Sequence, residues 1–311
     1  MIRTDLALEA QELYRENAAA ESAIDGVETD ISQTGNVSVT KIRITNENGA
    51  TALGKPVGTY VTVEAPDLKF NEKDYETACR LAADAIREML SPKPEHVTLV
   101  VGLGNRNVTP DALGPAAVDR LMITTHMKKH MPEYLDDSIG GVCAIIPGVL
   151  GTTGLESAEI VGGVVKEAKP DAVIAIDALA ARSPDRLSTT IQIGNTGIRP
   201  GAGIGNRRGG LSQEALGVPV IAIGVPTVID ASTIVQDTVF QIVQAIEESK
   251  LPEQEREMLI AKTLSQSIDQ MMVTPKDIDL IIERAAKTVA NSINLALHRD
   301  LTFEDIENYV G

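Results

Sequence analysis

Residues 97–105 read VTLVVGLGN, a short run of mainly β-branched apolar residues that ends in a glycine-rich turn. The same order recurs at 143–148 (CAIIPG), 172–176 (AVIAI) and 218–224 (VPVIAIG). Apolar runs of this length are typical of strands that are buried on both faces of a sheet. We therefore expect an α/β fold with a mostly parallel or mixed central sheet flanked by helices.

The segments around these strands carry other patterns. Residues 4–25 and 71–90 have the periodicity of helices, and the second of them ends at a proline-containing turn. Alternating apolar and polar residues at 37–65 predict an edge hairpin, with its turn at 46–49 (NENG). From about residue 231 onward the pattern is helical, apart from breaks at two prolines.

The bulk composition limits the class of protein. The chain has 311 residues, of which 43% are hydrophobic but only 3% aromatic, so its core must consist mainly of Val, Ile, Leu and Ala. The net charge of -16 argues against binding to nucleic-acid phosphates, because such binding needs clustered Lys and Arg. We expect a globular protein without a direct nucleic-acid partner.

Neither the cysteines nor the N-terminal residues indicate export. Cys79 and Cys143 lie far apart in the sequence and resemble neither a disulfide framework nor a metal-binding cluster, which favours a reducing compartment. No apolar stretch reaches the roughly 18 residues of a membrane-spanning helix, and charges stand at Arg3, Asp5 and Glu9, where a signal peptide would be apolar. We expect a cytoplasmic protein that does not enter a membrane.

Two aspartates follow the apolar runs. Asp111 lies in the loop after the run at 97–101, and Asp177 directly follows the run at 172–176. In parallel sheets, ligands and catalytic groups gather beyond the carboxyl ends of the strands, so both residues are candidates for a site. Each could instead be the N-cap of a helix, since each precedes residues of high helix propensity. The apolar run before Asp177 favours an enclosed carboxyl group there.

A second glycine-rich stretch, 194–210, is too long and irregular for a simple turn, and we expect it to line a site. It contains Arg199, Arg207 and Arg208, whose guanidinium groups could bind an anion. It only loosely resembles a dinucleotide-binding motif and does not open directly from a buried strand, so we reject nicotinamide binding. A surface loop that uses glycine for backbone freedom is the alternative.

Other catalytic signatures are missing from the sequence. His126 and His130 are four residues apart, but no Glu follows His126, so the zinc-protease pattern is absent. There is also no Gly-x-Ser-x-Gly motif of a seryl nucleophile. We expect neither a metal ion nor another cofactor.

Four blocks in a fixed order resemble the signature sequences of the germination protease family. They are 101–105 (VGLGN) together with 108–115 (VTPDALGP), 175–182 (AIDALAAR), the glycine-rich 195–210, and 224–230 (GVPTVID). The resemblance implies an endopeptidase of the spore core, grouped with aspartic peptidases and similar in fold to hydrogenase-maturation peptidases and nucleoside phosphorylases. It also implies a homotetramer that is made as a zymogen and degrades small acid-soluble spore proteins.

The resemblance places the family's two catalytic aspartates on Asp111 and Asp177. One carboxylate would act as a general base on water, while the other, kept protonated by proximity, would polarise the scissile carbonyl or protonate the leaving amine. The sequence does not assign these roles individually, because a coupled pair titrates as a unit. We expect Arg199, Arg207 and Arg208 to bind the acidic residue before the cleaved bond.

The N-terminal residues 4–9, TDLALE, have the form of the family's own cleavage sites, which resemble Thr-Glu-(Phe or Ile)-Ala-x-Glu and are cut after the first acidic residue. We therefore expect self-cleavage between Asp5 and Leu6. It would divide the chain into a pro-segment, 1–5, and a single peptidase domain, 6–311. The alternative is an ordinary amphipathic helix start with Thr4 as its cap.

Three other functions fit parts of the sequence. A phosphorylase-like or hydrolytic enzyme of small molecules would use the parallel strands and the arginine-containing loop. A metal-dependent peptidase would use Asp111 and Asp177 as oxygen ligands. A non-catalytic acidic protein would merely hold spore proteins.

Overall fold

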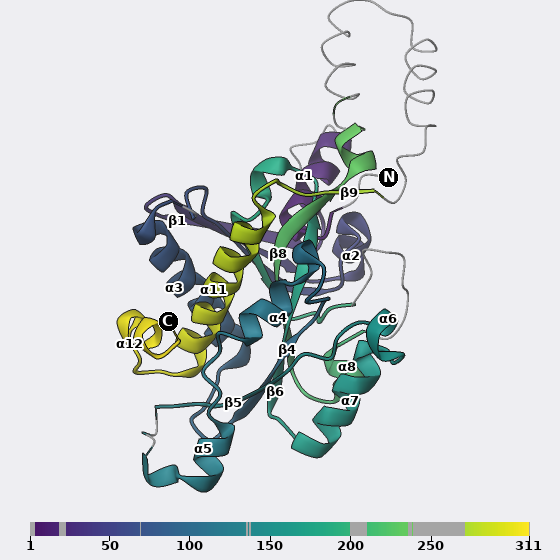
Figure 1. Cartoon of the computed structure of the whole chain (residues 1–311). Coiled ribbons are helices and arrows are strands. Elements are labelled where there is room, and N and C mark those ends of the chain that lie inside the picture. The colour runs from purple at the N-terminus through teal and green to yellow at the C-terminus, as the bar shows by residue number, and fades with distance from the viewer. Residues whose placement is uncertain are drawn as a thin grey trace, which may run out of the picture.

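The computed structural model describes residues 4–18, 23–68, 70–134, 136, 138–199, 210–235, 238 and 271–310. They form one mixed sheet with helices on both faces (Figure 1). Its strands run in the order β1-β2-β3-β7-β8-β6-β4-β5, and β9 pairs with β8. In chain order they are β1 (Val27–Thr34), β2 (Val37–Ile44), β3 (Gly58–Glu64), β4 (Val97–Gly102), β5 (Gly141–Ile145), β6 (Ala172–Ala181), β7 (Thr190–Gly194), β8 (Val220–Asp230) and β9 (Met272–Val273).

The sheet has a parallel half and an antiparallel half. Strands β5, β4, β6 and β8 pair in parallel, which the apolar runs predicted. From β8 the sheet continues through β7, β3 and β2 to β1, and all of these pairs are antiparallel. The expected α/β fold is confirmed, and of the two forms that we considered, the sheet has the mixed one.

Helices cover the two faces of the sheet. They are α1 (Ala7–Ala18), α2 (Glu47–Leu53), α3 (Glu72–Leu90), α4 (Leu113–Val118), α5 (Thr125–His130), α6 (Leu150–Thr153), α7 (Ser157–Ala168), α8 (Gln213–Leu216), α11 (Ile278–Leu297) and α12 (Phe303–Val310). The largest core cluster lies where α3, α4 and α11 pack on one face of the sheet. On the other face, α7 covers β4 and β6, while α1 and α2 cover β2 and β3 (Figure 1). This second face is therefore covered at its two ends by separate groups of helices.

Two local predictions were wrong. Residues 46–49 do not form a hairpin turn, because the Asn46 side chain accepts a hydrogen bond from the Gly49 N–H and begins α2. The strand at 172–176 does not end at Ile176, because residues 178–181 continue β6 and pair with β8. The sequence ALAA has high helix propensity, but tertiary pairing overrides it here.

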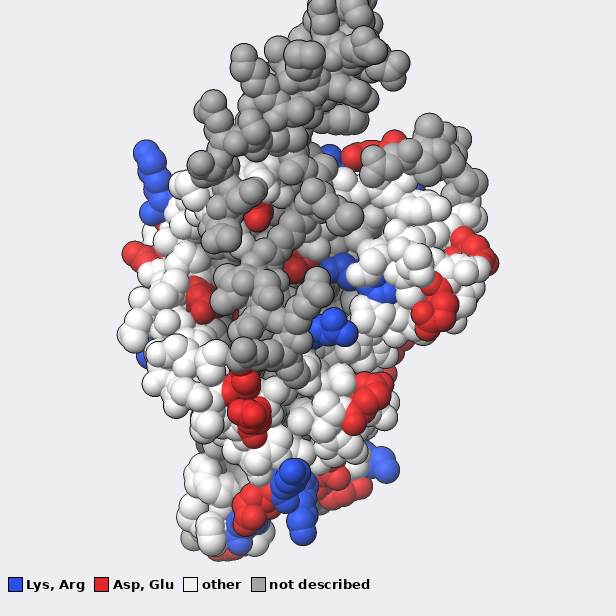
Figure 2. All heavy atoms as spheres, turned by 90° about the vertical axis from the view of Figure 1, so that its right-hand side faces the viewer, with Lys and Arg blue, Asp and Glu red and all other residues white. Residues whose placement is uncertain are grey.

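Charged side chains of both signs lie on the surface of the described residues. Figure 2 shows acidic and basic side chains interspersed on one face. In the part of the chain that the structure describes, no helix has the length and apolar character needed to cross a membrane.

Candidate active site

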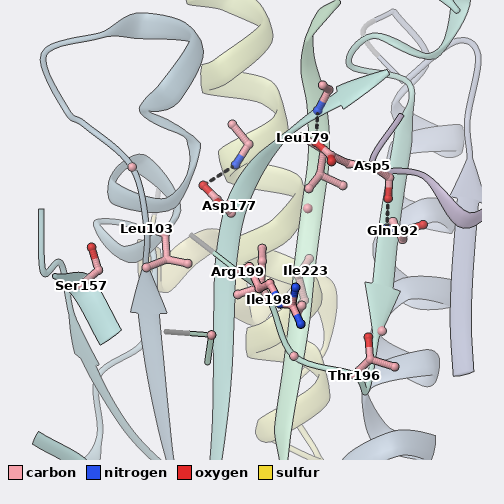
Figure 3. A pocket seen from close by; sticks show the side chains of 18 of the residues that line it. Asp5, Leu103, Ser157, Asp177, Leu179, Gln192, Thr196, Ile198, Arg199 and Ile223 are labelled. Atoms are coloured by element: carbon pink, nitrogen blue, oxygen red, sulfur yellow. Dashed lines mark hydrogen bonds between the residues drawn. The ribbon is translucent and has the colours of Figure 1, made fainter. Parts of the chain in front are cut away.

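A pocket of about 1450 Å³ lies on the second face of the sheet, between the two groups of helices. Its floor is formed by β6, β8 and β7, and its walls include the segment after α2 and the loop after β4. Figure 3 shows this pocket with Asp177, Gln192 and Asp5 around it. Asp111 lines it as well, so the fold brings both candidate aspartates to one place.

Asp177 lies in a row of three residues that crosses three strands. Asp177 of β6 and Gln192 of β7 are each in register with Gly224 of β8. The residues before and after them in each strand belong to the core under α3 and α11. Because successive side chains of a strand point to opposite faces of the sheet, this row lies on the other face, toward the pocket. Two strand spacings, about 10 Å together, separate the backbones of Asp177 and Gln192. The side chains at both ends of the row therefore border the space above β8.

Gly224 leaves that space open to another side chain. A Cβ atom at Gly224 would lie only 2.4 Å from Cγ of Leu179. Leu179 in turn packs with the fully buried Leu6 and Ala181. A larger residue at position 224 would displace Leu179 and with it the contact to the N-terminal segment.

The environment of Asp177 favours its protonated form. Burial raises the pKa of Asp177 to about 8, and the negative charges of Asp111 and Asp5 act in the same direction. The Ala178 N–H opposes this by donating to Oδ1 of Asp177 at 2.9 Å. At neutral pH Asp177 thus holds a proton that an ordinary carboxyl group would have released.

Asp111 ends the short 3-10 helix η1 (Thr109–Asp111). Its Oδ2 accepts a hydrogen bond from the Asn105 N–H at 2.7 Å. Burial raises the pKa of Asp111, while this hydrogen bond lowers it. Gly104 makes the close approach possible: its φ is +104°, and a Cβ there would lie 2.0 Å from the Asp111 carbonyl oxygen.

The helix-cap alternative is wrong for both aspartates. Helix α4 begins after Ala112 and has no side-chain hydrogen bond at its N-cap. Asp177 lies within β6 rather than before a helix. Neither carboxyl group caps a helix, and both line the pocket.

The N-terminal segment enters the same pocket and binds to two strands. The Asp5 N–H donates to the Ala180 carbonyl at 2.9 Å, and the Ala180 N–H donates to Oδ2 of Asp5 at 2.8 Å. On the other side, Nε2 of Gln192 donates to the Asp5 carbonyl at 3.0 Å, and Oε1 of Gln192 accepts from the Ala7 N–H at 2.6 Å. Because β8 lies between β6 and β7, the segment passes over β8 (Figure 3).

Glu9 anchors the segment beyond the pocket. Its side chain is fully buried, although it carries a carboxylate. Oε2 accepts from the Arg182 N–H at 2.7 Å and Oε1 from the Ser183 N–H at 3.0 Å. Arg186 lies 3.4 Å away, and the Thr4 hydroxyl also donates to Glu9. Helix α1 does begin nearby, at Ala7, but Thr4 accepts from the Leu6 N–H, which precedes the helix.

The arginines expected at the site are only partly accounted for. Arg199 is exposed and lines the pocket, whereas Arg207 and Arg208 lie outside the described residues. Within the described residues, no group of three or more His, Cys, Asp or Glu is placed to hold a metal ion.

Sequence reasoning missed Lys55 and Gln192. Lys55 also lines the pocket, and its Nζ lies 2.9 Å from the Asp5 carbonyl oxygen. For Gln192 one signal was available, since it is a polar residue between two isoleucines of a strand. For Lys55 we find no local signal, because its partner is distant in the sequence.

An α/β protein whose pocket holds two interacting carboxyl groups and a bound stretch of polypeptide has the features of a peptide hydrolase. The chain matches the model of the germination protease family over residues 7–250 and 241–310. It is 44% identical to the germination protease of Clostridium tetani, over 100% of this chain and 99% of that protein. For the germination protease of Caldanaerobacter subterraneus the identity is 48%, over 98% and 97%. For that of Bacillus subtilis it is 39%, over 99% and 96%.

The chain belongs to the germination protease family. The family resemblance drawn from its sequence blocks is confirmed, and its class of activity is that of a protease. This favours the peptidase interpretation over an enzyme of small molecules.

Proposed function

We propose that this protein is the endopeptidase that begins the degradation of small acid-soluble spore proteins in the spore core during germination. One observation carries the proposal beyond family membership: the segment 4–9, which has the form of a cleavage site, enters with Asp5 the pocket that Asp111 and Asp177 line. An enzyme that holds its own Asp5–Leu6 bond at its site is arranged to process itself. Residues 1–5 would then be the pro-segment, and 6–311 a single peptidase domain.

In this proposal the two aspartates share the work of hydrolysis. Burial raises the pKa of both carboxyl groups, that of Asp177 to about 8, so we assign the proton at neutral pH to Asp177 and the role of the base to Asp111. Asp111 takes a proton from water as the water oxygen attacks the carbonyl carbon. Asp177 gives its proton to the amine nitrogen as the C–N bond breaks, and proton exchange with solvent then restores the pair. No cofactor enters these steps.

The remaining expectations extend this proposal. Arg199, with Arg207 and Arg208, would bind the acidic residue before the cut in a protein substrate, since guanidinium groups pair well with carboxylates. The active form would be a homotetramer, which analytical ultracentrifugation of the purified protein tests directly. A monomer at all concentrations would contradict it.

Self-processing is tested by incubating the purified chain at mildly acidic pH and sequencing its N-terminus. Leu6 should appear as the new first residue, because Asp5, whose bond to Leu6 would be cut, lies in the pocket that the two aspartates line. Asp111→Asn or Asp177→Asn should reduce the rate by orders of magnitude. Asp30→Asn, at an exposed position of β1, is the matched control and should process normally. If the two site variants mature alone at the normal rate, another agent makes the cut and the proposal is lost.

A further inference from the structure

The carbonyl oxygen of Asp5 receives hydrogen bonds from two side chains. Nζ of Lys55 lies 2.9 Å from this oxygen, and Nε2 of Gln192 lies 3.0 Å from it. This is the carbonyl of the Asp5–Leu6 bond, the bond whose cleavage the proposed function requires. Both donors come from parts of the chain far from residue 5, so the fold brings them to this oxygen.

We propose that Lys55 and Gln192 together bind and polarise the carbonyl group of the peptide bond that is cut, in the chain itself and in protein substrates. This inference rests on the proposed function and adds two catalytic residues to the aspartate pair. The ligand that they recognise is a peptide carbonyl, whatever side chain stands before it.

Gln192 is fixed so that its amide can only donate toward this carbonyl. Its Oε1 accepts the Ala7 N–H at 2.6 Å, which leaves Nε2 directed at the Asp5 oxygen. The Gln192 amide thus binds on both sides of the Asp5–Leu6 bond: Nε2 donates to the Asp5 carbonyl, and Oε1 accepts from the Ala7 N–H. On the opposite side the Asp5 N–H binds Ala180, so the register of the segment is fixed from both strands.

Lys55 is positioned by the end of α2. Gly54 ends this helix in the left-handed conformation, with φ 62°, and the Lys55 N–H donates to the Ala50 carbonyl at 3.2 Å. Lys55 Nζ also reaches the Thr4 carbonyl at 3.3 Å, so it binds two successive carbonyl groups of the segment. Burial lowers the pKa of Lys55, while the negative charges of Asp5 and Glu9 raise it. In such a low-dielectric pocket a hydrogen bond from Nζ to a carbonyl oxygen is stronger than it would be in water.

These two donors match what amide hydrolysis demands of its environment. When the water oxygen bonds to the carbonyl carbon, the π electron pair of the C=O group moves to oxygen, which becomes negatively charged. Lys55 and Gln192 would stabilise this charge by hydrogen bonding, without transferring a proton. When the pair returns, the C–N bond breaks and the amine takes its proton from the aspartate pair.

The test compares wild type with Lys55→Met and Gln192→Met, which keep side-chain length but lose the donor. The full-length chains are first matured with immobilised wild-type enzyme, which is then removed. Cleavage of a peptide that contains TDLALE is followed to obtain kcat and KM separately. Each variant should lose about 10²- to 10³-fold in kcat, the usual effect of removing one such donor, with KM changed only a few-fold.

Two further variants separate catalysis from folding. Lys55→Arg keeps a cationic donor, so its kcat should lie above that of Lys55→Met. A purely structural role of Lys55 would not predict that the donor restores kcat. Lys166→Met, at an exposed position of α7, should behave as wild type. Near-normal kcat in both Met variants, or a loss confined to KM, would overturn the inference. If wild type does not cleave the peptide, or if Asp177→Asn cleaves it equally well, the proposed function itself fails.

Discussion

Asp177 should make the folded protein less stable as the pH rises from about 4 to about 8. Its pKa is raised from an ordinary 3.8 to about 8, mainly by burial. Between these values the folded state keeps a proton that the unfolded state releases, so the folded state loses stability with increasing pH. This is the opposite of the usual effect of a carboxyl group that is paired with a cation.

The size of the effect follows from the shift. A group that is protonated only in the folded state changes the free energy of unfolding by about 1.4 kcal/mol per pH unit, which gives about 4 kcal/mol between pH 4.5 and 7.5. Two effects reduce this value. Water can enter the pocket, and the variant in which we would measure the effect, Asp111→Asn, lacks the negative charge of Asp111. We therefore expect roughly 2 kcal/mol over this interval.

The comparison is best made between Asp111→Asn and the double variant Asp111→Asn with Asp177→Asn, because neither should cleave itself. Urea unfolding at a series of pH values gives the free energy of unfolding of each. The double variant should gain stability over the single one as the pH rises, since its Asn side chain does not titrate. A difference that stays constant within about 0.5 kcal/mol from pH 4.5 to 7.5 would show that Asp177 has an ordinary pKa, and the assigned proton roles would fall with it.

Two other predictions concern a buried histidine and the exposed arginine. Burial lowers the pKa of His298 to about 4, so between pH 6.5 and pH 4 the unfolded state binds a proton that the folded state does not, and the free energy of unfolding should fall by up to roughly 3 kcal/mol. In an Asp177→Asn background, His298→Leu should remove this pH dependence. An unchanged pH profile of stability in that variant would contradict the prediction. Arg199→Met should slow the cleavage of peptides with Glu before the cut roughly tenfold more than that of the matching Gln peptides, and an equal loss on both would end the proposed role.

Much of the parallel half of the sheet could be predicted from the sequence. Strands buried on both faces are continuous apolar runs, so the cores of β4, β6 and β8 stand out in the sequence. Strand β1 does not, because all of its residues except the first are exposed and mostly polar. The extension of β6 was also missed, since ALAA forms a strand only through its pairing with β8.

The sequence likewise predicted only a part of the candidate site. Asp111 and Asp177 follow apolar runs, and inspection of the polar residues after such runs found them both, although β6 continues past Asp177. The contacts of the N-terminal segment could not be found in this way. Its partners Ala180 and Gln192 are 175 and 187 residues away from Asp5, and only the folded chain brings them together.

The mixed sheet explains why Asp177 could be predicted from the sequence and Gln192 could not. In β6, Asp177 follows the apolar run at 172–176, and Gly224 of the parallel strand β8 is in register with it. Strand β7 runs antiparallel to β8, and Gln192, the middle residue of β7, lies on the other side of Gly224 and enters the pocket from there. The antiparallel neighbour therefore adds a second side to the cleft, and a peptide that lies over Gly224 can meet an acid on one strand and an amide on another.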